Sequence, residues 1–185
     1  MPVLSLEPTV WPAELFLEGN PADAGFGHWC VLHTRPRAEK TLARHLLRSG
    51  VSFYLPIYER QKRFQRRTVR SYLPLFPGYV FLRGDHGARQ AAFETNLVAS
   101  CLPVSDQEQL ADDLIRIFRL LESGSLVTPE SRLQPGMPAE IVSGPLAGCR
   151  GRIIRCSKGA RFLVEVSFLQ QGASVEVDWS MIQRI

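Results

Sequence analysis

The chain has 185 residues, of which 45% are hydrophobic and 22% are charged, and its formal net charge is +4. This composition is typical of a soluble globular protein and argues against a disordered chain. No stretch approaches the roughly 18 consecutive apolar residues of a transmembrane helix, and the first residues lack the basic start and compact apolar core of a signal peptide. We therefore expect a cytoplasmic protein that does not contact a membrane.

The charge is distributed unevenly along the chain. Residues 1–27 carry four acidic side chains and no Lys or Arg. Residues 35–72 carry eleven Lys or Arg against Glu39 and Glu59, which gives this segment a net charge of +9 and half of all basic side chains. Such a concentration predicts a surface that faces a polyanion, although charged segments that only face solvent are also common.

The first 27 residues form an extension without clear periodicity, and Trp11, Leu15 and Phe16 are the side chains that would hold it against a neighbouring surface. Regular patterns begin at His28. Residues 28–34 predict a strand, and a helix begins at Pro36 and stops at Gly50. Alternation over residues 51–59 predicts one further strand, in which Pro56 indicates an edge position or a bulge.

A long basic hairpin connection follows, and residues 78–83 predict the returning strand. The next segments read as a short helix, an apolar strand and an amphipathic helix, over residues 85–96, 97–104 and 105–124. The order βαββαβα predicts an α+β fold. We expect an α/β sandwich over residues 28–122, in which the helices pack on an antiparallel-containing sheet.

The remaining residues predict a second, smaller domain. Residues 123–135 are polar, contain Gly and Pro, and lack periodicity, which favours a linker. Residues 136–185 contain several short β-rich runs separated by turn sequences. Five short strands in about 50 residues fit a small closed β-barrel better than an open sheet with unprotected edges.

An aromatic pair follows a break in the chain at Pro77-Gly78. Because side chains alternate along a strand, Tyr79 and Phe81 share one face of the returning strand. If the opposite face packs under the helices, these two rings lie on the second face of the sheet. There they either pack beneath a loop or form a docking pocket for an external apolar element. Composition alone favours ordinary packing.

The sequence indicates neither a metal site nor an active site. Its four cysteines form no C-x-x-C, and its four histidines show no metal-ligand spacing. We expect reduced and mostly buried thiols and no cofactor. No nucleophile–base pair, paired carboxylates or phosphate-binding loop is evident, so the sequence predicts a protein that is not an enzyme.

Three segments in this order resemble the NusG family of transcription elongation factors: HWCVLHTRPRAEKTLARHLL, YLPLFPGYVFL and PGMPAEIVSGPLAGCRGRI. The first two resemble the family's N-terminal domain. The third resembles its KOW motif, which is carried on a small SH3-like barrel, and the pattern G-P-x-A-G-x-x-G is intact at Gly144–Gly151. The resemblance covers about residues 28–185. We expect the KOW glycines Gly144, Gly148 and Gly151 to permit tight turns.

The resemblance implies a monomeric transcription elongation and antitermination factor. Its N-terminal domain would bind the clamp helices of the largest RNA polymerase subunit and promote processive elongation. Its KOW barrel would recruit a small-subunit ribosomal protein or the termination factor Rho. By position, the resemblance assigns polymerase binding to Phe76, Tyr79 and Phe81, and recruitment by the barrel to Leu146, Phe168 and Leu169.

Proteins of the specialised RfaH branch of the family also contact the opposing lobe of polymerase. They do so through a short polar motif near the start of the second helix. Residues 87–90 of this chain, Gly-Ala-Arg-Gln, do not reproduce that motif. The sequence therefore does not support this contact with the opposing lobe.

Nucleic-acid contacts are expected at two places. In RfaH-like proteins the loop between the first strand and the first helix faces the non-template DNA strand, which assigns His33, Arg35 and Arg37 to this contact. Arg can pair with phosphate or guanine, and His can stack on a base. The alternative is that Arg35 and Arg37 are merely exposed basic residues near the start of a helix. In the basic arm, the candidates for phosphate contacts of little sequence specificity are Arg63, Arg66 and Arg67.

Two alternatives stay open. A KOW-containing RNA-binding or ribosome-associated protein would use the same basic arm on ribosomal RNA. Within the family, the HTRPRAEK loop and the acidic extension favour a specialised paralogue, similar to the RfaH or UpxY branch, over a general factor.

Overall fold

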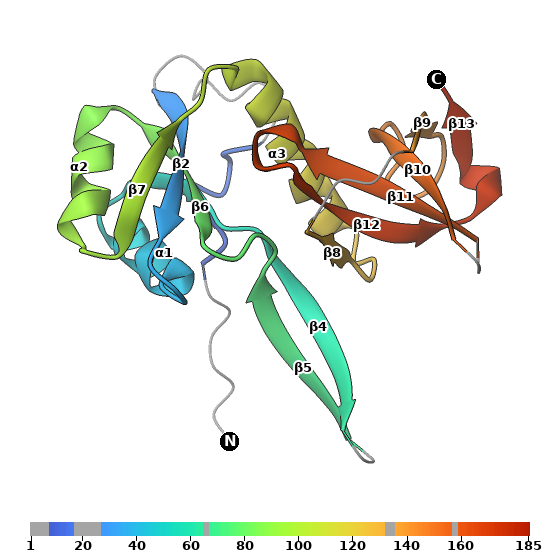
Figure 1. Cartoon of the computed structure of the whole chain (residues 1–185), viewed down its shortest axis with the longest axis horizontal. Helices are drawn as coiled ribbons and strands as arrows, with labels where there is room; N and C mark the ends of the chain where they lie inside the picture. The colour runs from blue at the N-terminus through green and yellow to red at the C-terminus, as the bar shows by residue number, and fades with distance from the viewer. Residues whose placement is uncertain (1–7, 17–26, 65–66, 132–135, 157–158) are drawn as a thin grey trace. The chain divides into compact units, whose positions relative to one another are not determined.

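A computed structural model of the chain describes residues 8–16, 27–64, 67–131, 136–156 and 159–185 (Figure 1). The chain divides into two compact units. Unit 1 comprises Met1–Pro56 and Phe76–Gln107, and unit 2 comprises Ile57–Leu75 and Glu108–Ile185. Within the described ranges, no helix combines the length and the apolar character that a membrane span requires.

Unit 1 is built on a five-stranded antiparallel sheet with the order β1-β3-β6-β2-β7. Helix α1 contacts β3 and β6, and helix α2 contacts β6 and α1. This arrangement confirms the predicted α+β sandwich with helices packed on an antiparallel sheet. The bounds of its elements are β1 Val10–Trp11, β2 His28–Thr34, α1 Glu39–Arg48, β3 Ser52–Tyr54, β6 Tyr79–Gly84, α2 His86–Glu94 and β7 Val98–Pro103.

Two local predictions in unit 1 need correction. Helix α1 begins at Glu39 rather than at Pro36, because Arg37 adopts a left-handed backbone with φ +61° that a helix does not accommodate. The single strand predicted over residues 51–59 is divided at Leu55-Pro56 into β3 and β4. All three residues of β3 are buried. Other segments of the protein therefore cover both faces of this strand, whereas the predicted alternation would leave one face exposed.

The N-terminal extension contributes to unit 1. Strand β1 pairs with β3, with Val10 opposite Tyr54. Leu15 is buried, and the Phe16 ring stacks on Trp29 with 6.0 Å between centroids and meets Tyr54 edge-on at 4.8 Å. Leu15 and Phe16 are therefore confirmed as side chains that hold the extension in place.

Unit 2 contains a two-stranded hairpin, a helix and a six-stranded antiparallel sheet with the order β13-β9-β10-β11-β12-β8. We call this six-stranded sheet the β domain. Five of its strands lie within residues 136–185, as predicted. The bounds of the elements of unit 2 are β4 Ile57–Phe64, β5 Arg67–Pro74, α3 Gln107–Glu122, β8 Thr128–Glu130, β9 Met137–Ile141, β10 Arg150–Cys156, β11 Gly159–Val166, β12 Gln171–Val177 and β13 Ile182–Arg184.

The segment predicted as a linker, residues 123–135, is not wholly a linker. Its residues Thr128–Glu130 form β8, which pairs with β12 at the edge of the β domain. The Ser174 hydroxyl also donates a hydrogen bond of 2.7 Å to the Glu130 carboxylate. The polar composition of this segment hid the strand, because an edge strand of three residues carries almost no periodic signal.

The three KOW glycines have two different roles. Gly144 and Gly148 adopt left-handed φ angles of +86° and +82°, which confirms their predicted role in turns. Gly151 instead lies inside strand β10. A Cβ atom on Gly151 would overlap the Leu163 carbonyl oxygen and come within 2.8 Å of the Phe162 ring. The prediction of a turn is therefore wrong for Gly151, which allows close approach of two strands.

A buried carboxylate joins helix α3 to the β domain within unit 2. Asp113 is 1% exposed. It accepts hydrogen bonds of 2.8 Å from the Ser167 backbone N–H and the Gln109 side-chain amide, and Arg116 lies 3.6 Å away. Burial nevertheless raises the pKa of Asp113 above its ordinary value, because loss of solvent outweighs these favourable contacts.

We expect Asp113→Asn to stabilise the chain at pH 7 relative to the wild type. The raised pKa means that the folded state favours the protonated carboxyl over the ionised one. The wild type therefore keeps its full stability below the unfolded-state pKa of Asp113 and loses stability as the pH rises through the folded-state pKa. Asn keeps an acceptor for the Ser167 N–H without the ionisation. Urea unfolding between pH 4 and 8 should show a stability difference that shrinks towards acid pH. Asp112→Asn, which changes an exposed neighbour, is the control and should alter the free energy of unfolding at pH 7 by less.

Candidate functional site

Three loops of unit 1 meet where β2 ends and β6 begins. The Thr34 backbone N–H donates a hydrogen bond of 2.8 Å to the Gly78 carbonyl, and the Arg35 N–H donates one of 2.8 Å to the Leu97 carbonyl. These bonds join the loop after β2 to the turn before β6 and to the loop before β7. We call residues 33–37 together with residues 76–79 the loop corner.

A buried carboxylate fixes the Pro77-Gly78 turn at the loop corner. Gly78 adopts a φ of +86°, and its backbone N–H donates a hydrogen bond of 2.6 Å to Oε1 of Glu39. Glu39 is buried in the first turn of α1. The turn and the start of helix α1 are thus linked, so the side chains on either side of Gly78 have a defined position.

The loop corner brings together residues that the sequence assigned to two different partners. His33 lies directly opposite Tyr79 in the pairing of β2 with β6, and the two ring centroids are 5.3 Å apart. His33 is exposed and Tyr79 is half-buried. Arg35 and Arg37 follow in the same loop, and both are exposed. The corner therefore offers two rings for stacking and two guanidinium groups for anions.

The other two aromatic residues predicted to bind polymerase are buried. Phe76 is 1% exposed and Phe81 is 0% exposed. Their rings pack edge-to-face at 6.0 Å, and Phe81 also lies 6.4 Å from the Tyr54 ring. The expectation that Tyr79 and Phe81 form an uncovered pair is therefore wrong for Phe81. Tyr54 lies opposite Phe81 in the pairing of β3 with β6, and the extension covers this side of the sheet, since Phe16 packs against Tyr54.

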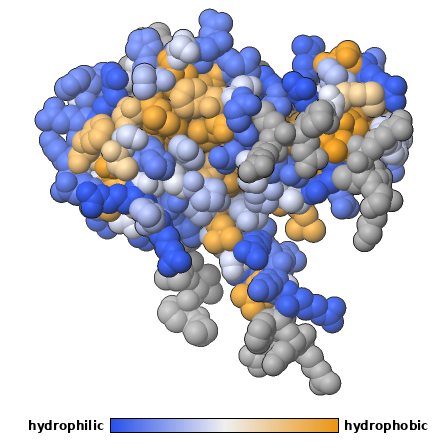
Figure 2. Space-filling model, viewed as in Figure 1, coloured by the Kyte–Doolittle hydropathy of each residue, from blue (hydrophilic) through white to orange (hydrophobic). Residues whose placement is uncertain are grey.

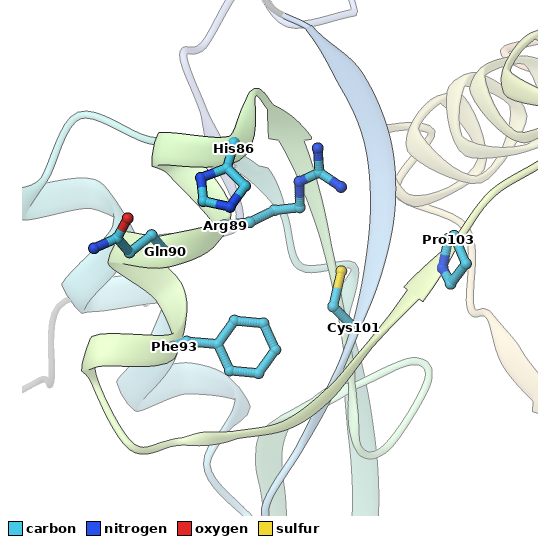
Figure 3. A pocket seen from close by; sticks show the side chains of 6 residues that line it. All are labelled: His86, Arg89, Gln90, Phe93, Cys101 and Pro103. Carbon is cyan, nitrogen blue, oxygen red and sulfur yellow. The ribbon is translucent and has the colours of Figure 1, made fainter.

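A second feature of unit 1 is a pocket of about 520 Å³ between α2 and β7 (Figure 3). Its lining residues are His86, Arg89, Gln90 and Phe93 from α2, and Cys101 and Pro103 from β7. The resemblance associates the start of this helix with the opposing lobe of polymerase. Sequence reasoning missed Phe93, which is 43% exposed, although its position four residues after Arg89 places both on one face of the helix.

The buried Cys30 thiol, next to Cys101 of this pocket, resists ionisation. Burial, together with the neighbouring Cys101 thiol, raises the pKa of Cys30 to about 12. Cys30 and Cys149 are buried free thiols and Cys101 is half-buried, in agreement with the prediction for these three. The side chain of Cys156 lies outside the described residues. In the described part of the chain, no three His, Cys, Asp or Glu side chains are grouped as a metal site would require.

The basic arm forms the hairpin β4–β5, on which Figure 2 shows hydrophilic side chains with a smaller apolar area. Of the predicted contact residues, Arg63 has an exposed side chain on β4. Arg66 and the side chain of Arg67 lie outside the described residues.

The β domain exposes a different apolar set from the one expected. Leu146 is buried, because the turn around it folds back and the Gly148 N–H donates a hydrogen bond of 2.7 Å to the Ile141 carbonyl. The assignment of Leu146 as an exposed contact is therefore wrong. Phe168 is 37% exposed and Leu169 is half-buried. The sequence reading missed other exposed apolar side chains, among them Val142 and Trp179.

Comparisons with known proteins relate most of the chain to one family. Residues 27–118 match the family model described as transcription termination factor nusG. The curated transcription termination/antitermination protein NusG of Pseudomonas aeruginosa is 23% identical over 177 residues, which are 85% of this chain and 98% of that protein. A solved structure of Thermotoga maritima NusG, described as showing domain interaction, is 20% identical with a TM-score of 0.48, and covers 85% of this chain and 97% of its own.

Proposed function

Because the chain belongs to the NusG family of transcription termination and antitermination factors, we propose that it binds the clamp helices of the largest RNA polymerase subunit and promotes processive elongation. The matched relative is named for transcription rather than for an enzymatic reaction. We place the docking function in a domain over residues 28–122, and recruitment in a domain over residues 136–185. Within residues 28–122, the segment Ile57–Leu75 and the residues of helix α3 from Glu108 onward belong to unit 2.

Tyr79 is the residue that supports docking at the loop corner. It keeps part of its ring at the surface, while Phe76 and Phe81 pack behind it in the interior. A half-exposed aromatic ring on a rigid turn can bury apolar area against a helix at a small entropic cost. Phe76 and Phe81 then act as the packing that positions Tyr79, and they do not contact polymerase themselves.

The same corner supports contact with the non-template DNA strand. His33 stands beside Tyr79 and can stack on an unpaired base. The exposed Arg35 and Arg37 guanidinium groups can bind phosphates or the edge of a guanine. A factor docked through Tyr79 would therefore hold these three side chains close to its polymerase contact.

The pocket between α2 and β7 is the proposed place of contact with the opposing lobe of polymerase. It lacks the polar motif of the RfaH branch, and it offers the exposed Phe93 ring beside the Arg89 side chain. An apolar side chain of the partner, next to an acidic group, would match this lining.

The β domain is proposed to recruit a small-subunit ribosomal protein or Rho. Phe168 and Leu169 carry over from the resemblance, and the exposed Val142 and Trp179 extend the apolar surface available to a partner. Exposed aromatic residues are frequent anchors in protein interfaces.

Tyr79→Ser is expected to weaken binding to purified core RNA polymerase by roughly 30-fold, which corresponds to about 2 kcal/mol for a central aromatic contact. Tyr72→Ser is the matched control, because it removes an exposed tyrosine from the hairpin. Biolayer interferometry measures both affinities, and thermal unfolding verifies that the variants fold. Unchanged affinity of folded Tyr79→Ser would refute docking through the loop corner.

The alternative function, a ribosome-associated or RNA-binding protein, has a separate test. Co-sedimentation of the tagged chain with ribosomes, without retention on polymerase, would decide for it. If polymerase binding holds, genome-wide occupancy separates a general factor, present wherever polymerase transcribes, from a specialised paralogue enriched at a few operons.

A further inference from the structure

The backbone of Gly78 supports both aromatic rings of the loop corner. Its N–H donates the 2.6 Å hydrogen bond to Glu39, and its carbonyl accepts the 2.8 Å hydrogen bond from the Thr34 N–H. A Cβ atom on Gly78 would lie 3.6 Å from the His33 ring, so this ring lies against the turn. Tyr79 is the next residue in the chain. A shift of the Gly78 backbone would therefore displace both rings.

The Glu39 carboxylate is buried and has one polar partner. Glu39 is 6% exposed, and among the described residues only the Gly78 N–H donates a hydrogen bond to its carboxylate. Burial of a carboxylate is unfavourable unless hydrogen bonds or an opposite charge offset it. Glu39 lies in the first turn of α1, where the positive end of the helix dipole provides part of this offset. Because its side chain is almost wholly enclosed, Glu39 can affect a partner only through the turn that it holds.

Gly78 needs an external constraint to keep its conformation. Its φ of +86° lies in the left-handed region, and glycine has more backbone conformations open to it than any other residue. A hydrogen bond to a charged acceptor is stronger than one between neutral groups. The bond to Glu39 thus selects one conformation of the turn. Without it, the turn would populate other conformations, in which Tyr79 and His33 are no longer held side by side.

We propose that Glu39 is a positioning residue for both contacts of the loop corner. By accepting the hydrogen bond from Gly78, it holds Tyr79 in place for polymerase and His33 in place for a nucleic-acid base. Each partner then meets a corner that is already ordered, which lowers the entropic cost of either binding event. The proposal rests on the proposed function and deepens it, because it names the residue on which both contacts depend.

The test compares Glu39→Ala with Glu39→Gln in the full chain. Both substitutions remove the charge, but only Gln keeps an acceptor oxygen for the Gly78 N–H. The first probe is core RNA polymerase without nucleic acid, and biolayer interferometry gives its Kd. The second probe is a fluorescent single-stranded DNA of about 12 nucleotides, a length within the usual range of site sizes, and anisotropy gives its Kd.

Glu39→Ala should weaken binding of both probes by the same factor. We expect each Kd to rise about tenfold, since a hydrogen bond to a charged group is lost. The two factors should be equal, because the apparent affinity for either partner falls with the fraction of molecules whose corner is ordered. Glu39→Gln should keep both wild-type affinities. Unequal factors in Glu39→Ala would mean that the two contacts do not share one support, which would overturn the proposal.

A double variant distinguishes positioning from general destabilisation. If Glu39 acts on polymerase binding through Tyr79, adding Glu39→Ala to Tyr79→Ser should not weaken polymerase binding further, whereas it should still weaken DNA binding. Hydrogen exchange of the Gly78 amide should accelerate in Glu39→Ala and keep its wild-type rate in Glu39→Gln. Thermal unfolding verifies that each variant is folded under the assay conditions.

Equal exchange of the Gly78 amide in the wild type and both Glu39 variants would overturn the proposal, as would a Glu39→Gln protein that binds as weakly as Glu39→Ala. Failure of the docking function gives a different result. If Tyr79→Ser binds polymerase like the wild type, while Glu39→Ala but not Glu39→Gln weakens DNA binding, docking fails and the positioning role for DNA stands. If Tyr79→Ser loses polymerase binding while Glu39→Ala keeps both affinities, docking stands and the positioning role falls.

Discussion

Phe81→Ala is expected to lower the free energy of unfolding of unit 1 by about 3–5 kcal/mol, the usual cost of removing a fully buried phenyl ring. Phe81 is 0% exposed and packs against Phe76 and Tyr54 at the centre of the sheet. Its removal leaves a cavity among side chains that the sheet holds in place. Chemical denaturation followed by circular dichroism measures the loss, with Tyr79→Ser as a half-buried aromatic control of smaller effect.

Phe81→Ala and Tyr79→Ser together distinguish a role in packing from a role in polymerase docking. Phe81→Ala should reduce polymerase binding only as far as it unfolds unit 1, so binding should recover in a stabilising osmolyte. Tyr79→Ser should reduce binding without a comparable loss of stability. A Phe81→Ala protein that unfolds like the wild type yet fails to bind polymerase would show that the ring reaches the partner, and that the buried packing is only one of its states.

Gly151→Ala is expected to destabilise the β domain by about 3 kcal/mol, the upper part of the range for overpacked interiors. The added methyl would overlap the Leu163 carbonyl oxygen, a backbone atom that cannot rotate away. Strands β10 and β11 pair directly at this point, with Arg152 opposite Leu163, so the clash would separate the two strands. Such a loss is large for a domain of about 50 residues.

Gly148→Ala is the matched control within the same motif. Gly148 has no neighbouring atom within 4 Å of the added Cβ, and only its φ of +82° opposes the substitution. Left-handed backbone costs an L-residue roughly 1–2 kcal/mol. Hydrogen exchange of β10 and β11 peptides should therefore accelerate much more in Gly151→Ala. Equal acceleration in both variants would mean that both glycines act through backbone conformation alone.

Local patterns in the sequence were sufficient for most elements. The periodicity of residues 28–34, 85–96 and 105–124 predicted β2, α2 and α3 within a few residues, because amphipathic spacing is a local property. The segments around Pro77-Gly78 and Gly144–Gly151 also indicated the family before any fold was known. Where prediction failed, at β3 and β8, the strands are three residues long, which is too short for a pattern.

The candidate site depended on tertiary structure. Sequence spacing placed His33 and Tyr79 in separate motifs, and only the pairing of β2 with β6 brings their rings together. Phe81 carried the same local signal as Tyr79, yet the cover over it comes from a distant part of the chain, Phe16 and Tyr54. Burial is a sum over all neighbours, including those far away in sequence, so local composition cannot decide which aromatic ring remains at the surface. The sequence by itself therefore determined most of the elements, the basic arm and the family, whereas tertiary packing decided which of their side chains a partner can reach.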